Sequence, residues 1–114
     1  MTLTALLLTL KILTVYIEAD DPSSHDDQTL ATCVSHAMTA RPSGLTIVTT
    51  PNQADATIRV ENRTGMRIHV LGSITLKDGT KLVTVNHVTH GLNHSLCHQA
   101  DGLLDELARK IPAH

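Results

Sequence analysis

The turn at Asp78-Gly79, with the two runs that flank it, constrains the fold of this chain more than any other feature. Apolar and polar residues alternate over residues 66–76 and again over residues 82–88. An Asp-Gly pair between two such runs is a strong signal for a β-hairpin. Residues 56–62 alternate in the same way and end at a turn over residues 63–65. The sequence therefore predicts three successive antiparallel strands.

A strand, a helix and a short strand are expected before this meander. Residues 11–18 are nearly continuously apolar, which favours an internal strand covered on both faces. Ser23 or Ser24 can cap a helix that runs to about residue 40. Residues 45–50 then form a short strand, ended by Pro51.

A closing amphipathic helix is expected over residues 93–111. Two such helices need one apolar sheet face to cover, so we expect an α/β (α+β) two-layer sandwich with both helices on one face. Its mixed, mostly antiparallel sheet has about five strands, in the order β-α-β-β-β-β-α. Residues 11–114 form a single domain, as the length of 114 residues allows.

The apolar segment 1–10 has two interpretations. It resembles the apolar part of a signal peptide, but it has no basic start and Lys11 interrupts it. It could instead be the first element of the folded domain. The run is too short for a transmembrane helix, so we expect none.

Composition excludes some partners. Tyr16 is the single aromatic residue, so bases have almost nothing to stack on. The net charge of −2 argues against a surface dominated by phosphate contacts. We therefore expect a protein partner and no nucleic acid.

Residues 86–99 hold four of the eight histidines. His94 and His98 lie one helical turn apart on the expected solvent side, a spacing at which two imidazoles can bind one ion. Asp101 could add an oxygen ligand, and His90 lies just before the helix. Such a set suits Zn²⁺, Cu²⁺ or Ni²⁺. The alternatives are a solvated polar face without metal and a pH-dependent contact surface.

Cys33 and Cys97 lie at the edges of the apolar faces of the two long helices. If those helices lie side by side, the pair can form a disulfide in an oxidising compartment; otherwise both are small buried residues. A catalytic Cys97 is disfavoured, because His98 points about 100° away from it on a helix. No nucleophile, P-loop or dinucleotide motif is present, so we expect no enzyme.

Three stretches carry a resemblance: Gly44-Leu45-Thr46-Ile47-Val48, Ala54-Asp55-Ala56-Thr57-Ile58-Arg59-Val60 and Leu76-Lys77-Asp78-Gly79. With the closing helix, this order resembles small bacterial envelope domains of the TolB amino-terminal and CsgG-lipoprotein type. The resemblance implies a non-enzymatic accessory role in the cell envelope, and hence a periplasmic or secreted location. A cytoplasmic location is the alternative. No functional residue carries over, and the chain has no lipobox cysteine near its start.

Strand alternation predicts that Arg59, Arg67 and His69 share the sheet face away from the helices. Antiparallel sheets often leave one face wet, and such a face can bind a partner. We therefore expect a small non-enzymatic binding or accessory domain outside the cytoplasm. The alternative is a metal-binding protein that uses the histidine cluster.

Overall fold

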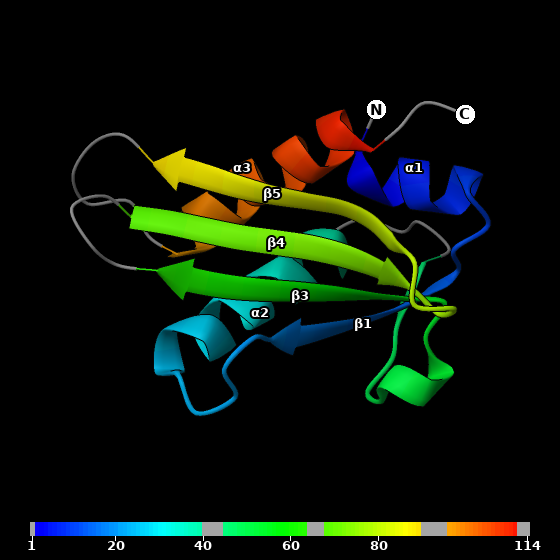
Figure 1. Cartoon of the computed structure of the whole chain (residues 1–114), viewed down its shortest axis with the longest axis horizontal. Helices are drawn as coiled ribbons and strands as arrows, with labels where there is room; N and C mark the ends of the chain where they lie inside the picture. Colours follow the sequence, from blue (N-terminus) through cyan, green and yellow to red (C-terminus); the bar gives the residue numbers. More distant parts are fainter. Residues whose placement is uncertain (1, 40–44, 64–67, 90–95, 112–114) are drawn as a thin grey trace.

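The computed structural model describes residues 2–39, 45–63, 68–89 and 96–111. Within these ranges the chain forms a five-stranded mixed sheet with α-helices packed on one side of it (Figure 1). The elements are α1 (Leu3–Thr9), β1 (Thr14–Ala19), α2 (His25–Thr39), β2 (Thr46–Ile47), a 3₁₀ helix (Pro51–Gln53), β3 (Ala56–Arg63), β4 (Ile68–Leu76), β5 (Lys81–Thr89) and α3 (Leu96–Lys110).

The strands lie in the order β2-β1-β3-β4-β5. β1 runs parallel to β2 and β3, whereas β3, β4 and β5 are antiparallel neighbours. At the β4–β5 turn the Leu76 N–H donates to the Thr80 carbonyl at 2.8 Å, and Gly79 has a φ of 93°, which only Gly adopts readily. The predicted fold class, a mixed sheet in an α+β arrangement, is confirmed.

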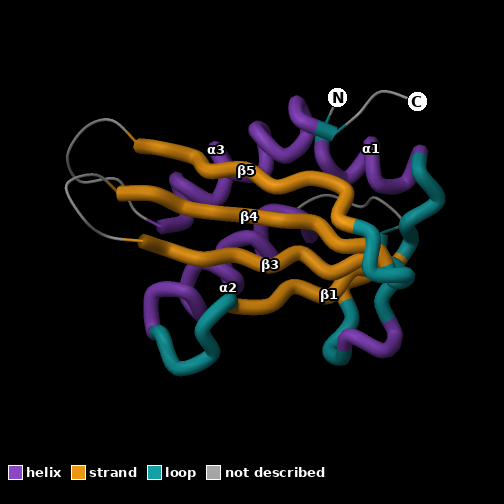
Figure 2. The backbone as a smooth tube through the Cα atoms, viewed as in Figure 1, coloured by secondary structure: helices purple, strands orange, loops and turns teal. Residues whose placement is uncertain are grey.

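The helices cover one face of the sheet, and the opposite face is turned toward the viewer in Figure 2. Register places Ile58 beside Ile74, and Ile74 beside Val83, and all three are buried under the helices. From α3, Leu103 is fully buried against β4. A Cβ at Gly72 would lie 3.0 Å from the Leu103 methyl groups, so this glycine allows close approach of α3 to the sheet.

α1 adds a third helix to the two that were predicted. Its Leu3 and Leu7 are buried in the same core as the sheet and the other helices, and α1 packs against α3. The Ala5 N–H donates to the Thr2 hydroxyl at 3.2 Å, which caps the helix. None of the helices in the described ranges is long and apolar enough to cross a membrane.

Two local expectations need correction. β2 has only two residues instead of the predicted 45–50, because the chain turns into the 3₁₀ helix at Pro51. β1 lies between β2 and β3, as expected of an internal strand, but helices cover only one of its faces. On its other face Glu18 forms an ion pair with Arg59.

Candidate functional site

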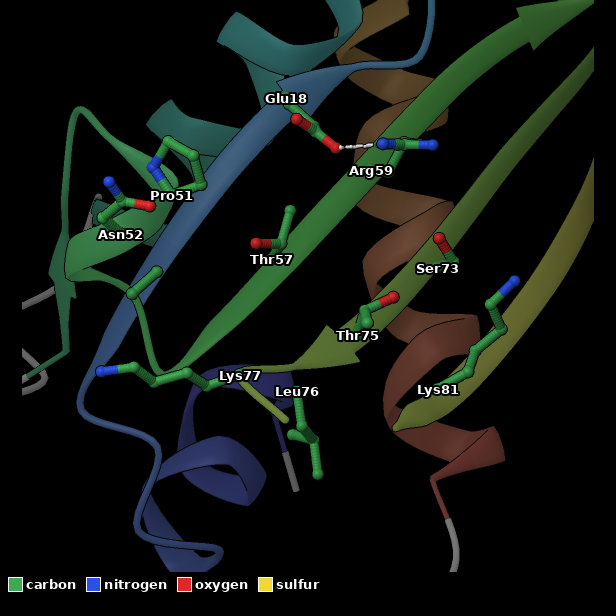
Figure 3. Close-up of a pocket in the computed structure, with 11 residues that line it drawn as sticks. Glu18, Pro51, Asn52, Thr57, Arg59, Ser73, Thr75, Leu76, Lys77 and Lys81 are labelled. Atoms are coloured by element: carbon green, nitrogen blue, oxygen red, sulfur yellow. Dashed lines mark hydrogen bonds and ion pairs between the residues drawn. The ribbon is translucent and has the colours of Figure 1, made fainter. Parts of the chain in front are cut away.

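The helix-free face of the sheet contains an open depression with a volume of about 690 Å³ (Figure 3). Neighbouring strands supply its floor, because Thr57 lies beside Thr75 and Arg59 lies beside Ser73 in the β3–β4 register. The 3₁₀ helix and the β4–β5 hairpin supply its rim. The lining residues are Glu18, Pro51, Asn52, Ala54, Thr57, Arg59, Ser73, Thr75, Leu76, Lys77 and Lys81.

An ion-pair network bounds the depression on the β1 side. The Arg59 Nε–H donates to Glu18 Oε1 at 2.8 Å, and a terminal guanidinium nitrogen lies 2.7 Å from the same oxygen. Asp20 Oδ1 lies 3.8 Å from the other terminal nitrogen. The hydrogen bond and charge of Glu18 raise the pKa of Arg59 above its usual value. The guanidinium is therefore already engaged by carboxylates of this chain.

Five other side chains of the lining present polar groups that form no hydrogen bond or ion pair with other described residues. The hydroxyls of Thr57, Ser73 and Thr75 make no hydrogen bond to any residue in the described ranges, and neither Lys77 nor Lys81 forms an ion pair there. These groups are available to donate hydrogen bonds or positive charge to a ligand.

Asp55 fixes the edge of this surface. Its Oδ2 accepts hydrogen bonds from the Leu13 N–H at 3.0 Å and the Thr14 N–H at 3.2 Å, and these bonds lower the pKa of the carboxyl group. The Lys77 N–H donates to the Asp55 carbonyl at 2.9 Å. One residue therefore ties the start of β1 to the β4–β5 hairpin. Asp55 belongs to the stretch 54–60 on which the resemblance to envelope domains rests, but the sequence analysis predicted no structural role for it.

Of the three residues predicted to form a binding face, the structure describes Arg59 and His69, and strand register puts both on the helix-free face. Arg59 lines the depression, and His69 lies further along the same face, beside Arg63 in the register. His69 Nδ1 lies 3.2 Å from Asn86 Oδ1, at hydrogen-bond distance. Arg67 is outside the described residues.

Lys77 and Lys81 were missed as site residues. They flank the Asp-Gly turn. A predicted hairpin does not indicate that the lysines beside its turn border a depression. The signal in the sequence was only their position, one on each side of the turn.

The predicted metal site is only partly covered by the structure. His90 and His94 lie outside the described residues, whereas His98 and Asp101 are exposed on α3. In the described ranges no group of three or more His, Cys, Asp or Glu side chains is placed to hold a metal ion. The histidine metal site therefore stays a prediction.

A disulfide joins Cys33 of α2 to Cys97 in the first turn of α3, with their Cα atoms 4.9 Å apart. The helices do lie side by side, which was the condition for the predicted bridge. In this state neither sulfur is a thiolate, so neither can act as a nucleophile.

His87 faces the helices, and its Nδ1 lies 3.0 Å from Glu106 Oε1 of α3. A Cβ at Gly102 would lie 2.5 Å from His87 Nε2. Glycine at this helical position therefore makes room for the imidazole ring.

Comparison with known proteins identifies the fold alone. No protein-family model and no curated protein matches the chain. A PelC dodecamer from Paraburkholderia phytofirmans matches with a TM-score of 0.50 and 9% identity, over 82% of this chain and 82% of the PelC chain. A dodecamer of the PelC L103M variant matches with a TM-score of 0.49 and 10% identity, over 82% and 81%. The resemblance to TolB and CsgG-type domains stays a prediction.

Proposed function

We propose that this chain is a small non-enzymatic binding domain that contacts a protein partner through the helix-free face of its sheet. One observation carries the proposal: helices cover only one face, and the other face has a depression lined by hydroxyl and ammonium groups that form no hydrogen bond or ion pair with a described residue. Concave sites with a few converging polar groups are where ligands and partners bind.

We place the domain outside the cytoplasm. The disulfide between Cys33 and Cys97 supports this location, because such bonds persist in oxidising compartments and are rare in the cytosol. The resemblance of residues 44–79 to envelope domains points in the same direction. An accessory role in the cell envelope is consistent with both.

Site-specific photo-crosslinking in the native host tests this function. A photoreactive residue is placed at Ser73 or Thr84, which lie side by side on the helix-free face. The matched control is Thr32, an exposed residue on α2. We expect the same partner adduct from both sheet positions and none from Thr32.

An adduct from Thr32 of equal yield would contradict the proposal, because the contact would then not select the sheet face. Absence of any adduct from Ser73 and Thr84 in correctly folded protein would also contradict it. Thermal unfolding of each variant shows whether the fold is kept.

A further inference from the structure

The depression is more positive than the chain that carries it. Its lining includes three basic side chains, Arg59, Lys77 and Lys81, and one acidic side chain, Glu18. The whole chain has a net charge of −2. Glu18 is bound to Arg59 and Asp20 lies 3.8 Å from the same guanidinium, so the basic groups of the lining without an ion pair to a described residue are the two lysines.

Two acidic residues beside the β4–β5 hairpin, Asp78 and Asp55, accept hydrogen bonds from backbone amides. Asp78 Oδ1 accepts from the Thr80 N–H at 2.8 Å, and Asp55 Oδ2 accepts from two N–H groups at the start of β1. The charge of Lys77 helps to lower the pKa of Asp55, but the two side chains form no ion pair in the described ranges. Because neither Lys77 nor Lys81 forms an ion pair with a residue in the described ranges, both ammonium groups can still pair with a ligand.

The two ammonium groups lie on opposite sides of Thr75 and Leu76 (Figure 3). Two separated point charges fit carboxylates spaced along a chain better than one compact anion. Phosphate is bound best by the planar guanidinium of arginine, which can donate two hydrogen bonds at once. The one arginine of the lining, Arg59, already donates to Glu18, so a phosphate would have only the lysines to bind. Between the lysines, the Thr57, Ser73 and Thr75 hydroxyls can bond to a passing polar chain.

We infer that the depression binds an acidic, extended segment of the partner protein, with carboxylates on Lys77 and Lys81 and polar groups on the hydroxyl floor. This inference rests on the proposed function and names the chemistry that the partner presents. The lining has no aromatic side chain, so the recognition is electrostatic and does not involve stacking.

Titration of the full chain with end-blocked, fluorescently labelled hexaglutamate tests the inference by anisotropy at low ionic strength. Hexaglutamine is the uncharged control peptide. We expect Lys77→Gln and Lys81→Gln each to weaken hexaglutamate binding about tenfold, the value of one charge-assisted contact. Lys110→Gln removes an equal charge from the exposed end of α3 and leaves the affinity within about twofold. Raising the salt concentration weakens binding to the wild type.

Three results would overturn the inference. Hexaglutamate does not bind, or Lys110→Gln weakens it as much as the site variants, or sodium phosphate binds through Lys77 and Lys81 while the peptide does not. The proposed function is judged separately. If the partner adduct at Ser73 is unchanged in Lys77→Gln/Lys81→Gln, the proposed binding function stands, but the inference that the partner presents an acidic segment is wrong.

Discussion

At Gly102, a side chain of another element, His87 of β5, limits which residue can be accommodated. A Cβ there would meet Nε2 of His87 at 2.5 Å and Cε1 at 2.9 Å. The His87 ring is held in this position by the contact of its Nδ1 with Glu106 Oε1 at 3.0 Å, so moving it aside would disturb that contact. We therefore expect Gly102→Ala to lose the gain of about 1 kcal/mol that alanine usually gives in a helix, or to destabilise the protein. Urea unfolding measures the difference.

The control for this prediction is the same substitution in a His87→Ala background. With the ring removed, Gly102→Ala is expected to raise the free energy of unfolding by about 1 kcal/mol. Equal effects in both backgrounds would show that the imidazole does not determine the residue at position 102.

Asp27 illustrates what sequence reasoning at the residue scale can and cannot supply. The helix dipole favours an acid in the first turn of α2, and Ser24, one of the two predicted caps, accepts a hydrogen bond from the Asp27 N–H. The Asp27 carboxylate is nevertheless buried. It accepts from the Asn62 N–H at 2.8 Å and the Asp21 N–H at 3.1 Å. Helix preferences explain why an acid is favourable at this position. The hydrogen bond from Asn62 of β3 depends on the tertiary fold and could not be predicted from them.

At the scale of elements, the disulfide joins the two helices that cover the sheet. Cys33 and Cys97 are separated by 64 positions in the sequence. A bridge of this kind stabilises a protein by about 2–4 kcal/mol, chiefly by restricting the unfolded chain. We expect Cys33→Ala/Cys97→Ala to lower the free energy of unfolding by this amount, measured by urea denaturation.

Reducing agent supplies the matched comparison for the disulfide. The wild type in reductant should fall to the stability of the double variant, and the double variant should not respond to reductant. A wild type that keeps its full stability in reductant would contradict a bridge that stabilises the fold.

The elements themselves were largely readable from the sequence. Alternation predicted β3, β4 and β5, and the Asp-Gly pair predicted the turn between the last two. The short β2 was overestimated because strand preference over residues 45–50 competes with the turn at Pro51. α1 was left with two interpretations, since an apolar run of ten residues carries no periodicity strong enough to separate them.

At the scale of the whole molecule, acid should destabilise the fold. Hydrogen bonds to the carboxylates lower the pKa values of Asp21, Asp55 and Asp78 below 3.8. Because the unfolded chain then takes up protons first, the stabilisation present above about pH 4 is lost as pH falls through the lowered folded pKa values. We expect unfolding free energies measured from pH 7 to pH 2 to decline most steeply below pH 4.

Asp55→Asn isolates one part of this decline. It should lower stability at pH 7 by about 1 kcal/mol, because charged acceptors bond amides more strongly than neutral ones, and it should reduce the loss on acidification. Asp105→Asn, on the exposed face of α3, is the control and should lower stability at pH 7 by less than Asp55→Asn does. An Asp55→Asn profile parallel to that of the wild type would contradict the role of this carboxylate.

The site is a property of the whole molecule, which is why the sequence predicted only part of it. Alternation alone put Arg59 and His69 on the outer face. The depression needs the 3₁₀ helix, the sheet and the β4–β5 hairpin to meet, and that meeting depends on register and on Asp55, which contacts both β1 and the hairpin. Spacing along a chain does not encode such convergence between distant segments.

The scarcity of aromatic residues has a spectroscopic consequence. Tyr16, the one aromatic side chain, lies beside Thr57 in the β1–β3 register and shares the strand face of Glu18 at the border of the depression. With no tryptophan to dominate the emission, ultraviolet fluorescence of the unlabelled protein comes from this single reporter. Quenching or enhancement on adding a ligand would then report events at the helix-free face, without a dye and without a substitution.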